Sequence, residues 1–162
     1  MSSISDFTLT ELVTGIKKKD FTSQEVTESF ITSSEKSKKL NTYITKCFDE
    51  AMSSAKNFDK KKDFKGLLAG VPIAVKDLFC TKNIKTTAGS KILHNFVPTY
   101  ESTVTSNLWS EGSFLLGKLN CDEFAMGSSN ETSFFGNVTN PFGDKLVPVS
   151  YTHLTLPTKR IV

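Results

Sequence analysis

One lysine stands at the end of an apolar run, and its position makes it the first candidate for chemistry. Lys76 follows six apolar or small residues, 70–75, a pattern typical of a strand buried on both faces of a parallel sheet. Strand ends in open α/β sheets face the crevice where ligands bind. A lysine held there is poorly hydrated, which favours its neutral form and lets it act as a base. The alternative is a lysine that extends from the sheet edge and pairs with Asp77.

Two acidic residues follow a second apolar run. Asp122 and Glu123 lie in the segment 117–127, which leads from residues 113–118 into a loop. Because the two residues are adjacent, their carboxyl groups do not face each other as a general acid and base would. We therefore interpret them as acidic residues at the start of a helix, where the helix dipole favours negative charge.

The candidate nucleophiles of the chain have little support from their surroundings. Cys121 has no neighbouring histidine, and Ser128 and Ser129 do not form the Gly-x-Ser-x-Gly pattern of a nucleophile elbow. The three cysteines, at positions 47, 80 and 121, are too few and too scattered for a disulfide framework, and they lack metal-ligand spacing. We expect reduced cysteines in a cytosolic protein, with no metal or cofactor site in this chain.

The elements that position these residues begin with helices. Thr8-Leu9-Thr10-Glu11 and Thr22-Ser23-Gln24-Glu25 are both capping boxes, so we expect a helix to start at each of them. Residues 40–48 are a candidate extended segment, and residues 49–58 a candidate third helix. The basic run 60–62 has no interleaved aromatic residues, so we interpret it as a solvated loop rather than a nucleic-acid site.

The central part of the chain predicts two parallel strands. Residues 70–75 and 113–118 have the apolar pattern of buried strands, and residues 103–109 that of a short helix ended by Gly112. Strand, helix and strand in this order indicate a right-handed βαβ crossover and therefore an α/β fold. Residues 127–140, rich in Gly, Ser, Asn and Thr, are predicted to form a loop.

Composition limits the classes of function. The 162 residues include 38% hydrophobic and 23% charged side chains, which is enough apolar material for a core and excludes an acidic disordered chain. The net charge is +3, but residues 1–148 hold 18 basic and 17 acidic residues, so little basic character remains there. No run approaches the roughly 18 apolar residues of a membrane span. The N-terminal segment lacks the features of a signal or transit peptide, which favours a bacterial, cytoplasmic protein over an organellar one.

The order and spacing of several segments resemble the amidase signature family. The lysine motif is Gly70-Val71-Pro72-Ile73-Ala74-Val75-Lys76-Asp77, and residues 98–104 resemble the helix start that follows it in the family. More particular similarities, to the branch formed by the A subunits of aspartyl/glutamyl-tRNA amidotransferases, lie in residues 119–128, 131–133 and 140–142. The resemblance covers about residues 5–148 and implies an amidase signature fold, a mixed sheet covered by helices, of which this chain holds the N-terminal part.

The resemblance implies that Lys76 is the catalytic base. Members of the family use a nucleophilic serine, a second serine with a cis peptide bond, and a lysine that relays a proton through the second serine to the nucleophile. In the amidotransferase branch the nucleophile attacks the side-chain amide of glutamine, forms a glutamyl-enzyme and releases ammonia. Met126, Gly127 and Ser128 are implied to line the substrate wall, and a purely structural role is the alternative.

The resemblance also implies partners. The A subunit of this branch forms a heterotrimer with subunits B and C, and its ammonia converts Glu-tRNA(Gln) to Gln-tRNA(Gln) or Asp-tRNA(Asn) to Asn-tRNA(Asn). The mischarged tRNA, ATP and Mg²⁺ are contacts of the partner subunit, so no cofactor is implied for this chain. The alternatives are a stand-alone amidase with another substrate and a binding fragment without catalysis.

The chain departs from the family pattern after Pro148. The family continues there with a Gly-Gly-Ser-Ser-Gly-Gly-Ser stretch, which supplies oxyanion-hole amides and the second serine, whereas this chain has Tyr151 at that serine position. Ser150 lacks the glycine neighbours of an oxyanion hole and is not expected to replace the nucleophile.

The residues after that point resemble a foreign sequence. Residues 149–158 match one reading frame of a transposon-derived sequencing adapter. We therefore expect 1–148 to be the N-terminal part of an amidase domain and 149–162 a non-native tail, and we expect a fragment without the two serines to be inactive.

Overall fold

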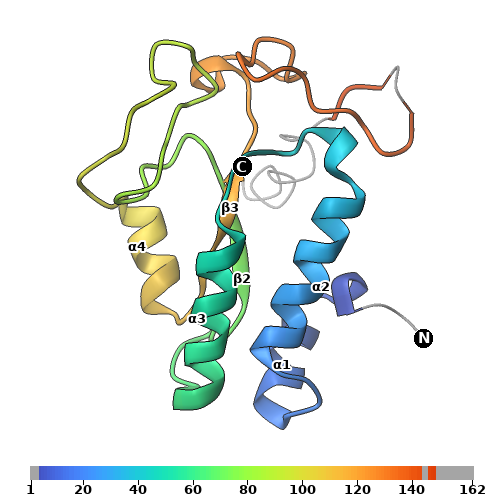
Figure 1. The fold of residues 1–162 in the computed structure, drawn as a ribbon, viewed down its shortest axis with the longest axis vertical. Coiled ribbons are helices and arrows are strands. Elements are labelled where there is room, and N and C mark those ends of the chain that lie inside the picture. The colour runs from blue at the N-terminus through green and yellow to red at the C-terminus, as the bar shows by residue number, and fades with distance from the viewer. Residues whose placement is uncertain (1–3, 144–145, 149–162) are drawn as a thin grey trace, which may run out of the picture.

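A mixed sheet forms the centre of the computed structural model, which describes residues 4–143 and 146–148 (Figure 1). Its strands are β1 (Tyr43–Lys46), β2 (Pro72–Lys76) and β3 (Phe114–Leu119). β3 lies in the middle, where it pairs parallel with β2 and antiparallel with β1. The predicted α/β class is therefore confirmed, together with all three predicted strands. The tail predicted at 149–162 lies outside the described residues.

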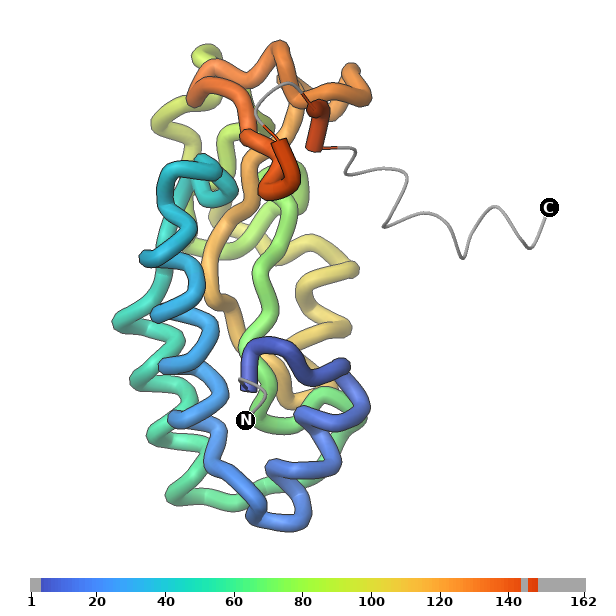
Figure 2. The backbone as a smooth tube through the Cα atoms, turned by 90° about the vertical axis from the view of Figure 1, so that its right-hand side faces the viewer, coloured from blue at the N-terminus to red at the C-terminus, as the bar shows by residue number. Residues whose placement is uncertain are grey.

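The parallel strands are joined by α4 (Thr103–Ser110), which confirms the predicted strand–helix–strand unit. Ser102 caps this helix, because its hydroxyl accepts a hydrogen bond from the Thr105 N–H at 3.2 Å. Gly112, at φ +86°, then turns the chain into β3, and a Cβ atom there would lie 3.0 Å from the Ala69 backbone. Helix α4 lies on one side of the sheet and helices α2 and α3 on the other (Figure 2).

The first two helices begin at the predicted capping boxes. Thr8 precedes α1 (Leu9–Lys18), and Thr22 precedes α2 (Ser23–Lys36). In α2 the Thr22 hydroxyl accepts from the Glu25 N–H at 3.1 Å, and the Glu25 carboxylate accepts from the Thr22 N–H at 2.7 Å. Asp59 of the third helix adds a tertiary cap, since its carboxylate accepts from the backbone N–H groups of Ser23 and Gln24 at 2.9 and 3.0 Å.

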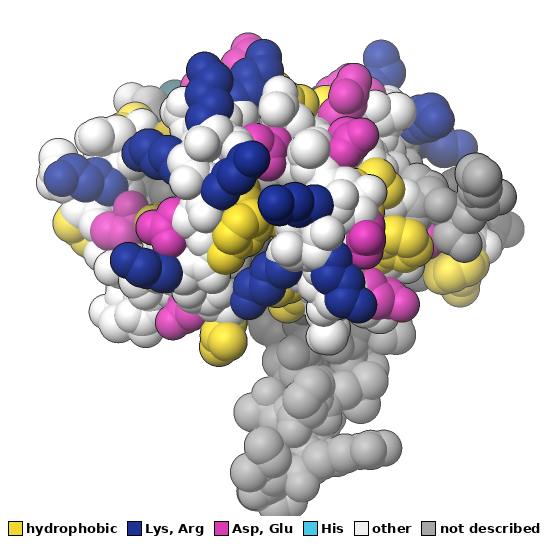
Figure 3. Space-filling model, turned by 90° about the horizontal axis from the view of Figure 1, so that it is seen from below, with side chains coloured by type: hydrophobic (Ala, Val, Ile, Leu, Met, Phe, Trp, Pro, Cys, Tyr) yellow, Lys and Arg dark blue, Asp and Glu magenta, His cyan; other side chains and the backbone are white. Residues whose placement is uncertain are grey.

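The third helix, α3 (Phe48–Lys61), is longer than predicted. The basic run 60–62 was interpreted as a solvated loop, but Lys60 and Lys61 form the last helical turn and Lys62 is its left-handed cap, at φ 52°. Cations at the carboxyl end of a helix are favoured by its dipole, so a basic run there extends the helix rather than ending it. On the face viewed in Figure 3, lysine side chains alternate with acidic ones, which agrees with a solvated surface.

A hydrophobic cluster joins the N-terminal helices to the start of β2. Leu12 and Ile16 of α1 and Val26 of α2 are buried against Val71. The cluster explains why short helices are stable here, because isolated helices of this length are marginal in water. Among the described residues, none of the helices is long and apolar enough to span a membrane.

Replacement of Thr22 by alanine should destabilise the protein by about 1 kcal/mol, because the capping box of α2 loses its side-chain acceptor. Urea unfolding followed by circular dichroism measures the free energy of unfolding. Thr32→Ala, at an exposed position within α2, is the matched control and should cost nothing measurable. Equal stability of the two variants would contradict the capping account.

Candidate active site

Lys76 is the last residue of β2, as predicted, and it lies beside Leu119, the last residue of β3. Because the two strands are parallel, their carboxyl ends share one edge of the sheet. The loops that follow them, residues 77–102 and 120–143, gather beyond that edge (Figure 1). This is the place where ligands bind in open α/β sheets.

The fully buried lysine is not Lys76 but Lys118. Lys76 is only half-buried, which corrects the expectation of a base enclosed at the strand end. Lys118 of β3 has no exposed surface, and its ammonium lies 3.6 Å from the carboxylate of Asp77, which is also fully buried. The ion pair that the structure shows for Asp77 is therefore made by Lys118, a partner that the sequence did not indicate.

Hydrogen bonds compensate both buried charges. The Lys118 ammonium donates to the Phe79 carbonyl at 2.7 Å and to the hydroxyls of Thr81 and Thr86 at 3.1 and 2.9 Å. One oxygen of Asp77 accepts from the Thr87 N–H at 2.8 Å and from the Thr87 hydroxyl. These contacts tie the loop after β2 to β3.

The pKa values of the pair reflect its burial. Burial raises the pKa of Asp77 above its ordinary value, and the Thr87 donors and the Lys118 charge oppose that shift. Burial lowers the pKa of Lys118, and the nearby Asp77 charge opposes that shift. The interaction of each charge with the other therefore favours the ionised pair against the cost of burial.

Asp122 and Glu123 hold loops together rather than beginning a long helix. The helical turn η3 (Glu123–Ala125) is a single 3₁₀ turn, and Asp122 makes no side-chain cap for it. The Asp122 carboxylate instead accepts from the N–H groups of Asn130 and Thr132 at 2.9 and 3.2 Å. Glu123 accepts from the Ser90 hydroxyl at 2.6 Å. The two acidic residues do stand at the start of a helical turn, as predicted, but their carboxylates bind residues distant in the sequence instead of capping it.

Backbone hydrogen bonds connect the segment after β3 to the strand that carries Lys76. The Ala88 N–H donates to the Asp77 carbonyl at 2.9 Å, and the Ala88 carbonyl accepts from the Phe124 N–H at 2.8 Å. Ala88 thus bridges the end of β2 and the start of the segment that holds Met126, Gly127 and Ser128. The predicted wall residues are brought to the same edge of the sheet as Lys76.

The three predicted wall residues differ in exposure. The side chain of Met126 is 79% exposed and Ser128 is exposed, so both are available for contact. Gly127 packs tightly, since a Cβ atom at this position would lie 2.4 Å from the Asp122 carboxyl carbon. Gly127 therefore lets Asp122 approach the loop backbone, whatever else the loop binds.

Cys121 is close to Lys76 but poorly suited to act as a nucleophile. Burial raises the pKa of its thiol to about 11, and the positive charge of Lys76 opposes this shift. A thiol with this pKa is protonated at neutral pH, which agrees with the sequence interpretation. No cluster of His, Cys, Asp and Glu side chains that could hold a metal ion is present in residues 4–143 and 146–148.

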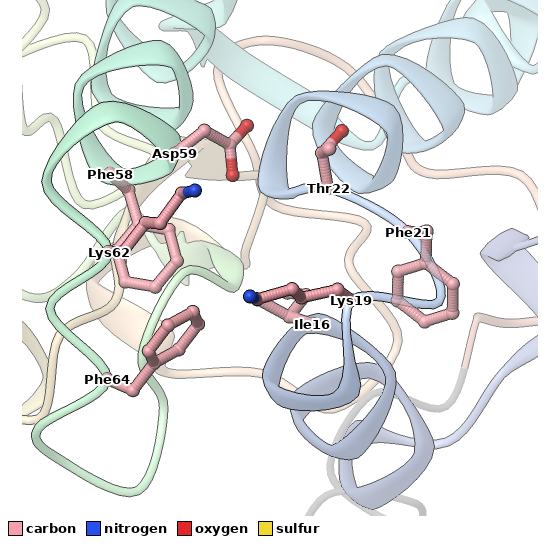
Figure 4. Close-up of a pocket in the computed structure, with 8 residues that line it drawn as sticks. All are labelled: Ile16, Lys19, Phe21, Thr22, Phe58, Asp59, Lys62 and Phe64. Carbon is pink, nitrogen blue, oxygen red and sulfur yellow. The ribbon is translucent and has the colours of Figure 1, made fainter.

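A separate hollow lies at the opposite end of the molecule from Lys76, between the ends of α1, α2 and α3. Figure 4 shows three aromatic rings around it, with the amino groups of Lys19 and Lys62 directed into its opening. The hollow contains the Asp59 carboxylate that caps α2, so its polar contacts are already explained by the fold.

A family profile and a solved structure each match more than half of the chain. The family profile described as Amidase matches residues 25–149, more than half of the chain. The chain belongs to the amidase family. A bacterial aryl acylamidase of the amidase signature family superimposes with a TM-score of 0.78 at 30% identity, covering 87% of this chain and 30% of that structure. The predicted amidase signature fold is therefore confirmed.

Sequence relatives within the amidase family are more similar. The A subunit of the glutamyl-tRNA(Gln) amidotransferase from Pelagibacter ubique is 66% identical over 148 residues, which is 91% of this chain and 30% of that protein. The protein of the same name from Hyphomonas neptunium is 51% identical over 147 residues, again 30% of its length. The chain thus spans about a third of these amidase-family relatives.

Replacement of Asp122 by asparagine should release the loop around Asn130 and Thr132 of this amidase-family chain. Burial acts to raise the pKa of Asp122, but the N–H groups of Asn130 and Thr132 and the Thr132 hydroxyl together lower it below the ordinary 3.8. The carboxylate therefore stabilises the loop at all pH values above about 4 and ceases to do so as the pH falls through the lowered pKa.

Hydrogen exchange of the Asn130 and Thr132 amides measures this effect. Exchange at neutral pH should be faster in Asp122→Asn than in the wild type, and Asp49→Asn on α3, outside this loop, should leave it unchanged. Equal protection of these amides in the wild type and Asp122→Asn would refute the role of the carboxylate.

Proposed function

We propose that the whole protein is the glutamine-hydrolysing subunit of a tRNA-dependent amidotransferase and that Lys76 is its catalytic base. The observation that carries the proposal is the 66% identity, over 91% of this chain, to the A subunit of a glutamyl-tRNA(Gln) amidotransferase. The position of Lys76 supports the role, because it is a half-buried lysine at the carboxyl end of a parallel strand.

The proposed reaction hydrolyses glutamine to glutamate and ammonia. A serine hydroxyl attacks the side-chain amide carbon, and its proton passes through a second serine to the amino group of Lys76. The carbon–nitrogen bond then breaks, the proton is returned to the leaving nitrogen, and ammonia departs from an acyl-enzyme. Water attacks the ester in the same way and releases glutamate. Lys76 accepts a proton at the start of each half-reaction and returns it before that half-reaction ends.

The remaining parts of the proposal concern substrate and partners. Met126, Gly127 and Ser128 form part of the wall around the glutamine side chain, supported by their place beside the end of β2. The released ammonia serves subunits B and C of a heterotrimer, which amidate Glu-tRNA(Gln), and Asp-tRNA(Asn) where that activity is present. ATP and Mg²⁺ are used by the partner subunit, and the complex acts in the bacterial cytoplasm.

A second candidate function is hydrolysis of another amide by a stand-alone enzyme. The structural similarity to an aryl acylamidase, at a TM-score of 0.78, favours this alternative. Glutaminase assays of the full-length protein alone and with its B and C subunits discriminate between the two. We expect glutamine turnover that depends on the partners, and partner-independent hydrolysis of aryl amides without glutamine turnover would favour the alternative.

Replacement of Lys76 by alanine in the full-length protein should reduce kcat for glutamine by roughly 10²–10⁴-fold, because proton transfer to and from the reacting groups is lost. The assay measures glutamate released by the complete complex. Lys61→Ala, an exposed lysine at the end of α3, is the matched control and should retain full turnover. Near-wild-type turnover of Lys76→Ala would exclude it as the base.

A further inference from the structure

The ion pair between Lys118 and Asp77 is the only one among the described residues in which both side chains are fully buried. Its members flank the candidate base, since Asp77 follows Lys76 in the chain and Lys118 lies on the neighbouring strand. Burying two charges is costly, and replacement of such a pair by apolar residues is often neutral for stability or stabilising. A contribution to stability alone therefore does not explain why the chain has a buried ion pair at this place.

The register of the sheet places the pair and Lys76 on opposite faces. Lys118 is paired with Val75, so these two side chains share a face, and Lys76 leaves the other face because side chains alternate along a strand. The Asp77 N–H donates to the Leu119 carbonyl at 2.9 Å. The strand end that carries Lys76 is thus fixed on one side while its side chain leaves on the other.

We propose that Lys118 and Asp77 are positioning residues for Lys76, which fix the end of β2 and keep the charge behind the base neutral. This inference rests on the proposed function of Lys76. The contacts of the pair show how it fixes the end of β2. Lys118 holds the Phe79 carbonyl and two hydroxyls of the loop after β2, and Asp77 holds Thr87 and the backbone of β3.

Lys118 is the charged partner of Asp77. The Asp77 Oδ1 atom is buried and accepts no hydrogen bond from the described residues, so the Lys118 ammonium at 3.6 Å is its compensating group. Cys47 and Cys80 are close enough to Lys118 to interact with its charge, and Cys121 is close enough to interact with both members of the pair and with Lys76.

Other groups around the pair contribute a constant background. Burial raises the pKa of the Cys47 and Cys121 thiols, so both stay neutral at the pH of the assay. Asp122 lies near Cys121, and its pKa is lowered, so it is charged throughout. These groups do not change between variants of Lys118 and Asp77.

Removal of either member should leave the other charged. Lys118 retains three hydrogen-bond acceptors that fit an ammonium, and Asp77 retains the N–H and hydroxyl donors of Thr87 that fit a carboxylate. Loss of Lys118 leaves a negative charge that holds the proton on Lys76 more tightly. Loss of Asp77 leaves a positive charge that favours its release.

The test is the pH dependence of kcat/KM for glutamine in the full-length protein with its partner subunits. In Lys118→Met the acidic limb of the profile should move to higher pH, and in Asp77→Asn to lower pH, each by on the order of half a pH unit. The double variant should return the limb to its wild-type position with a lower kcat. Lys46→Met and Glu35→Gln, which break an exposed ion pair, are matched controls and should shift nothing.

Opposite shifts in the two single variants support the proposal, because a general loss of packing would not move the acidic limb in opposite directions. Shifts of the same sign, or none, in folded variants overturn it.

If a single variant fails to fold, Thr87→Val removes one donor to Asp77 without a change of charge. This variant should lower kcat several-fold at unchanged KM and unchanged pH profile. An unchanged kcat in Thr87→Val counts against positioning. If Lys76→Ala abolishes turnover but neither Lys118→Met nor Asp77→Asn shifts the pH profile, this proposal is refuted. The proposed function then still stands.

Discussion

Parallel pairing of β2 with β3 places the carboxyl ends of both strands at one edge of the sheet, and the candidate site is built on that edge. The pairing runs from Pro72 beside Phe114 to Lys76 beside Leu119. Because parallel strands cannot be joined by a tight turn, the chain must cross over through α4 before it returns. The loops on either side of that crossover are consequently free to meet beyond Lys76.

Three polar anchors organise those loops. The buried pair of Lys118 and Asp77 binds the loop after β2, Asp122 binds the backbone at Asn130 and Thr132, and Ala88 bridges the two regions through its own peptide groups. Each anchor is buried, so its hydrogen bonds are hard to replace by water. The result is a set of irregular loops held in one arrangement around the strand ends.

Local patterns in the sequence predicted much of the fold and less of the site. The capping boxes at Thr8 and Thr22 and the apolar runs of β2 and β3 are local signals, and the elements formed where they indicated. The position of Lys76 followed from the same pattern. The role of Lys118 was missed because its partners are distant in the sequence. They reach it only when the loop that follows β2 folds over β3. The role of Asp122 was missed because its donors lie eight and ten residues further along the chain.

The most direct measurement of the central claim is a crystal structure of the full-length protein with a glutamine analogue bound. The account predicts that the Lys76 amino group lies within hydrogen-bonding distance, roughly 2.6–3.2 Å, of a serine hydroxyl supplied by another part of the protein. It also predicts that the ion pair of Lys118 and Asp77 remains intact behind it. A structure in which no serine approaches Lys76 and the analogue binds away from the ends of β2 and β3 would contradict the account.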